Sequence, residues 1–408
     1  MKGDRRALVG WVLYDFANTI FSFVVVTRYF NDWIVNERGQ PDYYVGLMAA
    51  AVSVALLFTL PVIGARADRT GRHVPILAVF TTVCVGMTAL LGIVEPVLLA
   101  LVVAGVATFA FNTADSQYHP LLAHVAAPER RGRVSGIGVA VGYVGTLTAL
   151  AIIGGIATDG HAQRAFLPAA ALFAVFALPL LLFVRETGHP PSPRVPVRPL
   201  RALAASLRRA RHEPYGRLLL ARFFYVDAIA TVIQFMTVYA RRTGDFDGRE
   251  LDVLLAVATV AALIGAVVAG VLAERVGPRR VVLVTLALTV SVLAAGAATG
   301  SSTLLWVLGP MVGIALGSLS AVDRVFLLRL VPPERRGEEF GLYALVGKLS
   351  SGFGPLVLWG GTVLAGTELL GLSKFDASRV AVGVLAITAL VGALILRPLS
   401  DRPVAQAT

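Results

Sequence analysis

Ionisable side chains lie inside segments of this sequence that are otherwise apolar. A charged group at the centre of a membrane-spanning helix costs about 2.5–3.5 kcal/mol on insertion scales, so each needs a partner or a function. Carboxylates can bind protons, arginine and lysine can bind anions, and opposite charges can pair between helices. The residues concerned are Asp15, Arg28, Asp115, Arg222, Asp227, Asp323, Arg324, Arg329 and Lys348.

Two interpretations fit the aspartates of this set. They can pair with nearby arginines and lock one end of a helical bundle. Alternatively, one of them binds and releases a proton, because removal from water favours the neutral form of a carboxyl group. Asp15 and Asp227 are the candidates for that second role.

Lys348 differs because it lies near the middle of its apolar segment. It can form an internal pair with Asp323 or Asp227, or it can receive the carboxylate of a bound molecule. Lys348 and Arg324 together supply positive charge that would suit an anionic or zwitterionic ligand. The internal pair and the ligand contact both remain open at this point.

Neutral polar side chains occur at similar depth, where hydrogen bonding between helices is their common fate. They are Asn18, Asn112, Tyr143 and Gln234. Asn18 lies one turn after Asp15 on nearly the same helix face, so we expect it on the wall of a cavity.

The elements that carry these residues are predicted to be membrane-spanning helices. Hydrophobic residues make up 56% of the chain, charged residues 15%, and the mean hydropathy is +0.75. Soluble domains are usually about half apolar and about a quarter charged. Each apolar segment approaches the roughly 20 residues that a spanning helix needs. The segments are 8–30, 44–63, 75–94, 97–123, 134–158, 165–184, 216–240, 251–272, 281–299, 303–331, 338–363 and 379–396.

The distribution of positive charge predicts the orientation. Lys and Arg gather in the N-terminal tail, the even-numbered loops and the C-terminal tail, so both termini should be cytoplasmic. The net charge of +11 requires only anionic lipid as a partner and no nucleic acid. The Arg-rich, Lys-poor composition and the short loops favour a bacterial inner (plasma) membrane.

Residues 185–215 divide the chain into two expected six-helix bundles, at 1–184 and 216–408. The proline-rich first part of this segment is typical of an extended linker. The following "PLRALAASLRRAR" predicts an amphipathic helix on the inner membrane face.

Several short motifs occur once in each half, which indicates two related bundles. "PERRG" begins at Pro128 and again at Pro333, and "GARADRTGRH" has a counterpart in "GVLAERVGPRR". Asp15 in the first segment corresponds to Asp227 in the seventh. Bundles repeated in this way usually enclose a binding site at their interface near mid-bilayer.

Charged residues of the repeated loops are expected to hold the cytoplasmic side closed, although such charges also serve as topology signals. Asp68 can accept amide hydrogens at the N-terminus of a neighbouring helix and can pair with arginine. The proposed gate residues are Asp68, Arg69, Arg72, Asp115, Arg130, Glu274, Arg275 and Arg335. Gly354 and Pro355 predict a kink in the eleventh segment.

Four motifs resemble a known family. "GARADRTGRH" resembles the signature of the major facilitator superfamily between spans two and three. "LYDFANTIFSF", "PERRGRVSGIGVAVGYVG" and "LVPPERRGEEFGLYALVGKLSSGFGP" are similar to the branch that contains the autophagy-related vacuolar amino-acid effluxers and their bacterial relatives. The resemblance implies an all-α membrane protein with twelve transmembrane helices in two pseudo-symmetric six-helix bundles.

It also implies a secondary active transporter that moves a small, amino-acid-like solute by alternating access, in the export direction. The carboxylates inside the apolar segments and the absence of ATP machinery favour coupling to protons over coupling to sodium. A multidrug exporter is the alternative, and a non-transporting receptor or scaffold is the alternative from another class. Substrate or coupling residues are expected among Asp15, Asn18, Asn112, Tyr143, Asp227, Gln234, Asp323, Arg324 and Lys348.

Enzymatic and metal functions have no support in the sequence. No "GxxxxGK[ST]" phosphate loop occurs, and the six histidines and the single Cys84 lack metal-ligand spacing. We therefore expect no enzyme activity, metal or cofactor. We also expect the protein to be a monomer.

Overall fold

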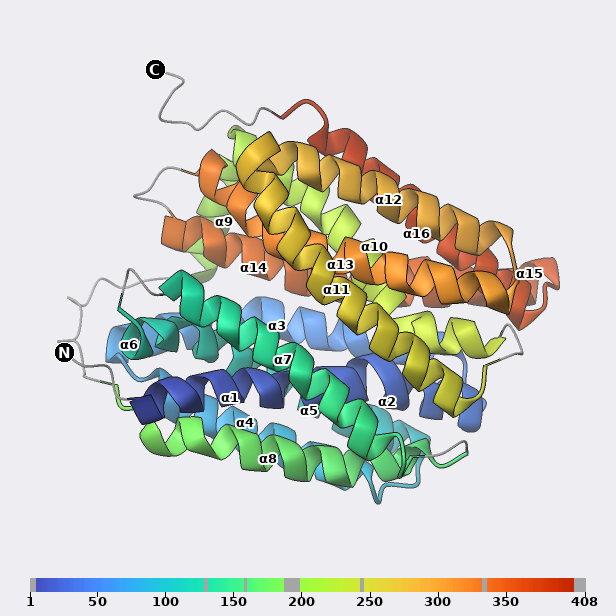
Figure 1. The fold of residues 1–408 in the computed structure, drawn as a ribbon, viewed down its shortest axis with the longest axis horizontal. Helices are drawn as coiled ribbons and strands as arrows, with labels where there is room; N and C mark the ends of the chain where they lie inside the picture. The colour runs from blue at the N-terminus through green and yellow to red at the C-terminus, as the bar shows by residue number, and fades with distance from the viewer. Residues whose placement is uncertain are drawn as a thin grey trace. The chain divides into compact units, whose positions relative to one another are not determined.

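The computed structural model describes residues 5–127, 131–157, 160–186, 199–242, 246–331 and 336–399, and these residues form helices and connecting turns without a β-strand. Twelve of the helices are long and apolar enough to cross a membrane (Figure 1). The prediction of an all-α protein with twelve transmembrane helices is therefore confirmed. The apolar segments are helical because a helix satisfies all of its backbone hydrogen bonds internally, which lipid cannot do for it.

Contacts divide the chain into two compact units. The first unit contains Met1–Gly39 and Val54–Leu200, and the second contains Gln40–Ser53 and Arg201–Thr408. Helix α3 (Asp42–Thr70) is therefore divided between the two units, because its first turns belong to the second unit.

The first unit is built around its N-terminal helix, which packs against α7 and α8, while α4 packs against α5 and α8. Its elements are α1 (Arg5–Phe21), η1 (Ser22–Arg28), α2 (Tyr29–Asp32), η2 (Trp33–Glu37), α3 (Asp42–Thr70), α4 (His73–Leu91), α5 (Val97–Tyr118), η3 (His119–Leu121), α6 (Leu122–Val125), α7 (Arg131–Ile153), η5 (Ala162–Ala165) and α8 (Phe166–Phe183).

In the second unit α10 packs against α14 and α16, and α12 packs against α13 and α16. Its elements, besides the start of α3, are α9 (Pro199–Ala210), α10 (Pro214–Arg242), α11 (Gly248–Val276), α12 (Pro278–Ala298), α13 (Ser302–Leu330), α14 (Arg336–Phe353), η7 (Gly354–Gly361), α15 (Thr362–Leu370) and α16 (Lys374–Leu396). The helix α9 forms where an amphipathic helix is predicted, and residues 187–198 of the expected linker lie outside the described residues.

Helices α11 and α13 approach each other most closely through small residues. A Cβ added at Gly313 or Gly317 would run into the backbone of Ala258 or Ala262. The hydroxyl of Ser318 donates to the carbonyl of Gly265 at 3.1 Å. Close backbone approach of this kind is how membrane helices gain packing energy without a hydrophobic driving force.

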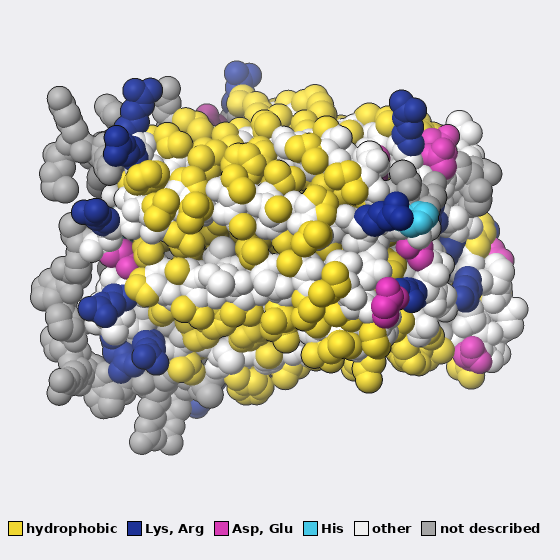
Figure 2. All heavy atoms as spheres, turned by 90° about the horizontal axis from the view of Figure 1, so that it is seen from below, with side chains coloured by type: hydrophobic (Ala, Val, Ile, Leu, Met, Phe, Trp, Pro, Cys, Tyr) yellow, Lys and Arg dark blue, Asp and Glu magenta, His cyan; other side chains and the backbone are white. Residues whose placement is uncertain are grey.

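Large apolar side chains cover the outer surface. Ile93, Leu98 and Val284 are each at least 70% exposed, which suits contact with lipid. Figure 2 shows one face on which apolar side chains form a broad band, with charged side chains gathered toward its two ends. This distribution fits a membrane-spanning protein.

Gly71 and Gly277, two glycines of the repeated loop motif, have the same structural role. Gly71 has φ +60° between α3 and α4, and Gly277 has φ +91° between α11 and α12. Only glycine adopts these angles without steric cost. The sequence repeat therefore corresponds to the same sharp turn in each half.

Some predicted boundaries were wrong. The first span, predicted to end at residue 30, continues to Glu37 through two π-helical segments. The last begins at Lys374 and not at residue 379. At the kink predicted from Gly354 and Pro355, α14 ends at Phe353 and the helix continues as the π-helical η7.

Candidate functional site

Asp227 is a buried carboxylate with an incomplete set of hydrogen bonds. It lies in α10 and is 1% exposed. The backbone N–H of Gly354 donates to its Oδ1 at 2.7 Å, while its Oδ2 has no hydrogen-bond partner among the described residues. One turn later Thr231 is fully buried, and its hydroxyl is likewise without a partner there. Two neighbouring polar atoms of α10 are thus without a partner in the part of the chain that the structure describes.

Because Gly354 has no side chain, it leaves room for the side chains of Asp227 and Thr231. A Cβ there would lie 2.5 Å from Asp227 Oδ1 and would also run into Thr231. The contact occurs where α14 gives way to η7. Changes of this type from α- to π-helix are frequent at functional sites.

Asp323, by contrast, is fully paired. It is 2% exposed and forms an ion pair with Arg222, while Tyr225 Oη and Tyr343 Oη donate to it at 2.5 and 2.9 Å. The Arg222 guanidinium also stacks on the Tyr343 ring, 3.6 Å from its centroid. This cluster joins α10, α13 and α14, and its charges compensate each other.

The structure gives Asp323 an ionic partner that sequence reasoning did not name. The ionic partner of Asp323 is Arg222, and no residue pairs with Oδ2 of Asp227 in the described part of the chain. Lys348 is half-buried in α14, and its backbone carbonyl accepts a hydrogen bond from Ser53 Oγ at 2.9 Å.

Arg324, the neighbour of Asp323, is exposed and forms no ion pair within the described residues. The ionic partner of Asp323 is therefore Arg222 and not Arg324. Gln234 is buried in α10, at 7% exposure.

In the first unit, two predicted residues come close together. Asn18 is buried, and its Nδ2 lies 3.5 Å from Asp115 Oδ1. His119 Nε2 lies 3.6 Å from the same oxygen. Asp15 is half-buried against α7, where a Cβ on Gly138 would run into its carboxylate. Asn18, predicted as a substrate residue, and Asp115, predicted as a gate residue, thus belong to one polar group.

Two other predicted polar residues of this unit are Asn112 and Tyr143. Asn112 Nδ2 donates to the carbonyl of Thr108 in its own helix at 2.8 Å. Tyr143 is half-buried in α7.

Of the proposed gate residues, Arg72, Glu274 and Arg275 are exposed. Arg69 is also exposed, and its Nε donates to the carbonyl of Ala65 in its own helix at 3.2 Å. The remaining members lie outside the described side chains, namely Asp68, Arg130 and Arg335.

Glu186 has the helix-capping role that the sequence suggested for Asp68. Its two carboxylate oxygens accept the backbone N–H groups of His73 and Val74 at 2.5 and 3.1 Å. These groups open α4, where the helix dipole favours negative charge. No local motif marks Glu186, because it follows α8 and reaches α4 only through tertiary packing.

Sequence reasoning also missed a buried ion pair between Asp42 and Arg242. Both terminal nitrogens of Arg242 donate to the Asp42 carboxylate, and one of them donates to Ser378 Oγ at 2.7 Å. Trp359 Nε1 donates to Asp42 Oδ2 at 2.7 Å. The two charged side chains are 4% and 8% exposed, although each lies at the end of an apolar segment like an ordinary loop charge.

A second buried pair lies within the first span. Arg28 and Asp32 are 3.0 Å apart and each is 1% exposed. Asn36 Nδ2 donates to Asp32 at 2.7 Å, and the Arg28 guanidinium lies 4.7 Å from the centroid of the Tyr29 ring. Asp32 was overlooked because the predicted span ended before it.

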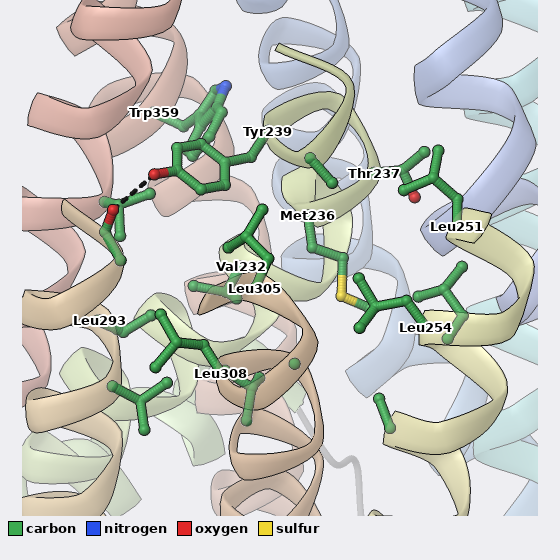
Figure 3. Close-up of a pocket in the computed structure, with 18 residues that line it drawn as sticks. Val232, Met236, Thr237, Tyr239, Leu251, Leu254, Leu293, Leu305, Leu308 and Trp359 are labelled. Carbon is green, nitrogen blue, oxygen red and sulfur yellow. Dashed lines mark hydrogen bonds between the residues drawn. The ribbon is translucent and has the colours of Figure 1, made fainter. Parts of the chain in front are cut away.

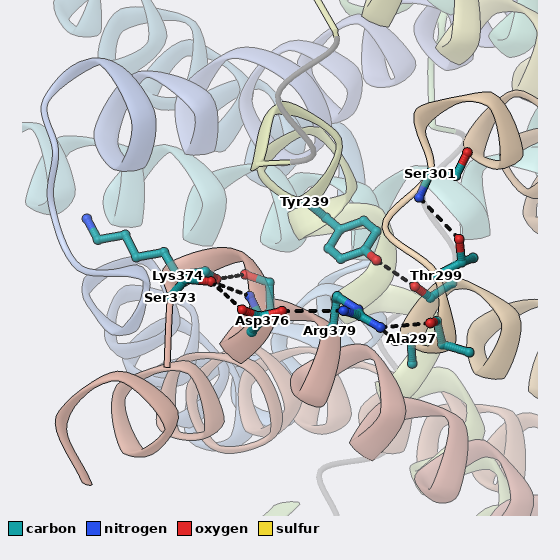
Figure 4. Close-up of polar contacts among 11 residues, drawn as sticks. Tyr239, Ala297, Thr299, Ser301, Ser373, Lys374, Asp376 and Arg379 are labelled. Atoms are coloured by element: carbon teal, nitrogen blue, oxygen red, sulfur yellow. Dashed lines mark hydrogen bonds and ion pairs between the residues drawn. The ribbon is translucent and has the colours of Figure 1, made fainter. Parts of the chain in front are cut away.

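In the second unit, Arg379 caps the C-terminus of α12 (Figure 4). Its Nε and one terminal nitrogen donate to the carbonyls of Ala297 and Ala298 at 3.0 and 2.7 Å. A positive charge suits this end of a helix dipole. Tyr239 Oη donates to the nearby carbonyl of Gly296 at 2.6 Å.

The second unit contains a partly open apolar cavity of about 90 Å³ (Figure 3). Its lining includes Met236, Leu254, Leu308 and Trp359. Drug-sized ligands usually occupy 300–1,000 Å³, so this cavity accommodates an alkyl group and not a whole drug-sized solute. Met236 lies on a different face of α10 from Asp227, which keeps the cavity separate from the buried carboxylate.

Comparison with known proteins gives a consistent result. A family model described as "Vacuole effluxer Atg22 like" matches residues 113–360, which is more than half of the chain. An uncharacterised transporter of the major facilitator type from Bacillus subtilis, YxiO, is 28% identical over 380 residues, covering 88% of this chain and 89% of that protein. Autophagy-related protein 22-2 of Aspergillus clavatus is 26% identical over 260 residues, covering 55% of this chain and 42% of that protein.

Solved structures of transporters have a similar fold. A mutant of the nucleoside transporter NupG matches with a TM-score of 0.78 at 13% identity, covering 96% of this chain and 99% of that one. A bacterial homologue of the human lysosomal transporter Spinster, in an inward-facing and unoccupied conformation, matches with a TM-score of 0.73 at 17% identity, covering 98% and 99%.

Proposed function

Because this chain belongs to the vacuole effluxer Atg22-like family, we propose that it exports a small, amino-acid-like solute by alternating access, coupled to protons. Its relatives and structural neighbours are transporters of the major facilitator kind and not enzymes, and the chain is a transporter of that kind. The solute, the coupling ion and the direction are the proposed part.

The environment of Asp227 is the observation that supports the proposed proton coupling. This carboxylate is 1% exposed and has no cationic partner among the described residues, and one of its oxygens is without a hydrogen bond there. An uncompensated buried charge costs several kcal/mol. Binding a proton removes that charge, so the occupied carboxyl is favoured while the site is closed to water.

Asp227 is the better candidate than Asp323 for this role. The Asp323 charge is compensated by Arg222 and by two tyrosine hydroxyls, which stabilise the ionised form in place. A proton carrier must change its charge during each cycle, and the pairing of Asp323 opposes such a change.

The orientation and location remain as the sequence predicts, with cytoplasmic termini in a bacterial plasma membrane. The positive residues of the even-numbered loops support this proposal. Reporter fusions that are active only in the cytoplasm or only outside it, placed after Arg397, test it. Activity of the outside reporter at this position would reverse the proposed orientation.

Transport by the purified protein in proteoliposomes is the decisive experiment for the function. A panel of labelled amino acids is tested with an imposed pH gradient, and empty liposomes serve as the control. Accumulation that collapses when the gradient is dissipated is the expected result. Flux of an amino acid that ignores the pH gradient would reject proton coupling alone.

Other outcomes point to the alternatives. If the folded protein transports no amino acid but moves lipophilic cations, the multidrug exporter replaces the proposed function. If it binds an amino acid without flux, a receptor does. Both outcomes contradict the proposal.

A further inference from the structure

The guanidinium of Arg222 is held firmly by two contacts. One terminal nitrogen, Nη1, pairs with Asp323, and the plane of the group stacks 3.6 Å from the centroid of the Tyr343 ring. The side chain is only 13% exposed. An arginine fixed in this way presents its remaining donors in one direction, with little entropy left to lose on binding a ligand.

Tyr225 lies within hydrogen-bond reach of the guanidinium, but one of the remaining donors has no acceptor. Nε of Arg222 is buried and has no hydrogen-bond partner among the described residues. None of the hydrogen bonds of the described residues uses the second terminal nitrogen, Nη2. Leaving a buried donor without an acceptor is unfavourable, and a ligand that accepts a hydrogen bond from it recovers that free energy.

Gly347 keeps the space beside Nη2 open. A Cβ added at Gly347 would lie 3.0 Å from Nη2, at the place that a ligand oxygen would occupy. Gly347 lies in α14, directly before Lys348 and one turn after Tyr343. The free edge of Arg222 therefore faces a position where the opposing helix has no side chain.

The chemistry of this edge selects an anion. Nε–H and Nη2–H of arginine are parallel donors that match the two oxygens of a carboxylate. Asp323 compensates the charge of Arg222, but Arg324 and Lys348 follow these contact residues in the chain and add positive charge nearby. The local balance therefore favours an incoming negative group.

We propose that the Nε–Nη2 edge of Arg222, above Gly347, binds the carboxylate of the transported solute. The inference rests on the proposed function, since it assigns one group of an amino-acid-like solute to a place on α10. Asp323 and Tyr343 act as positioning residues because they hold the guanidinium without touching the solute.

Gly347→Ala tests the subsite without changing any charge. Its methyl group would occupy the space beside Nη2, whereas Gly341→Ala in the same helix places a methyl group that meets nothing within 4 Å. Both variants are assayed with the amino acids that the wild type transports and with the corresponding amino-acid amides, which lack the carboxylate.

The expected result is a KM at least about tenfold higher for the amino acid in Gly347→Ala, as for a lost charge-assisted hydrogen bond, with Gly341→Ala unchanged. The wild type should bind the amide about as weakly as Gly347→Ala binds the amino acid. Arg222→Lys keeps the charge but loses the parallel donors, so its KM should also rise. Thermal unfolding in detergent verifies that each variant is folded.

Two failures are distinguishable. If the wild type transports amino acids and amides equally well, or if folded Gly347→Ala keeps the wild-type KM, the Arg222 subsite is wrong while the proposed function stands. If the folded wild type transports no amino acid, the proposed function fails and the subsite fails with it.

Discussion

Gly354 donates its backbone N–H to the carboxylate of Asp227 at 2.7 Å, from the point where α14 becomes the π-helical η7. The two residues are far apart in sequence and lie in different membrane-spanning helices. This bond supports only one carboxylate oxygen, so the contact holds Asp227 in place without compensating its charge. Any change in the charge of Asp227 is therefore coupled directly to the helix turn that contains Gly354.

Asp227→Asn should abolish accumulation driven by a pH gradient while exchange of solute across the membrane continues. The amide keeps the size of the side chain but cannot bind a proton at neutral pH. The measurement compares gradient-driven uptake with counterflow in proteoliposomes. Asp376→Asn, at an exposed carboxylate in the first turn of α16, is the matched control. Unchanged gradient-driven uptake in Asp227→Asn would show that the proton binds elsewhere.

Gly354→Ala should destabilise the protein, because the new Cβ would lie 2.5 Å from Asp227 Oδ1. Overpacking of this kind costs about 1–3 kcal/mol. Thermal unfolding in detergent measures the effect. At Gly86, in α4, an added Cβ meets nothing within 4 Å, so Gly86→Ala should leave the unfolding temperature the same or raise it. Equal stability of the two variants would contradict the described contact.

Removing either member of the buried pair Asp42–Arg242 should cost about 3–5 kcal/mol, because the other charge is left uncompensated. Asp42→Asn, Arg242→Gln and the double variant form a cycle, and the double variant should lose less than the sum of the single ones. The exposed pair Arg38–Glu95, at 2.7 Å, is the control and should contribute about 0–1 kcal/mol. Additive losses in the Asp42–Arg242 cycle would mean that the two residues do not interact.

Gly317→Leu should separate α11 from α13, since even a Cβ at this position would run into the backbone of Ala262. The expected result is a large loss of thermal stability, or failure to yield folded protein. Gly270→Leu in α11 is the control, because an added Cβ there meets nothing within 4 Å. A Gly317→Leu protein as stable as this control would be incompatible with the packing of α11 on α13.

The number and type of the spanning elements could be predicted from the sequence because they follow from local rules. An apolar run of about 20 residues in lipid must be helical to satisfy its backbone, whatever it packs against. The turn glycines Gly71 and Gly277 were recognisable for the same reason, since a positive φ is a local requirement. Asp227 was recognisable as a residue that needs a function because its cost in an apolar segment is also local.

The tertiary structure decided which partner each charged side chain has. The sequence left open whether Lys348 pairs with Asp323 or Asp227 or receives a ligand carboxylate, and it did not indicate that the packing of α10 and α13 supplies Arg222 as an ionic partner of Asp323. It suggested Asp68 as an acceptor at a helix N-terminus, and the Asp68 side chain lies outside the described ones, whereas Glu186, from the end of α8, caps the start of α4 without any local signal. Asp42 and Arg242 are distant in sequence, and each resembles a solvated loop charge until α3 and α10 meet. The electrostatic free energy of a charged side chain depends on its burial, and its burial depends on which helix faces pack together. The sequence of a single apolar segment does not determine that packing.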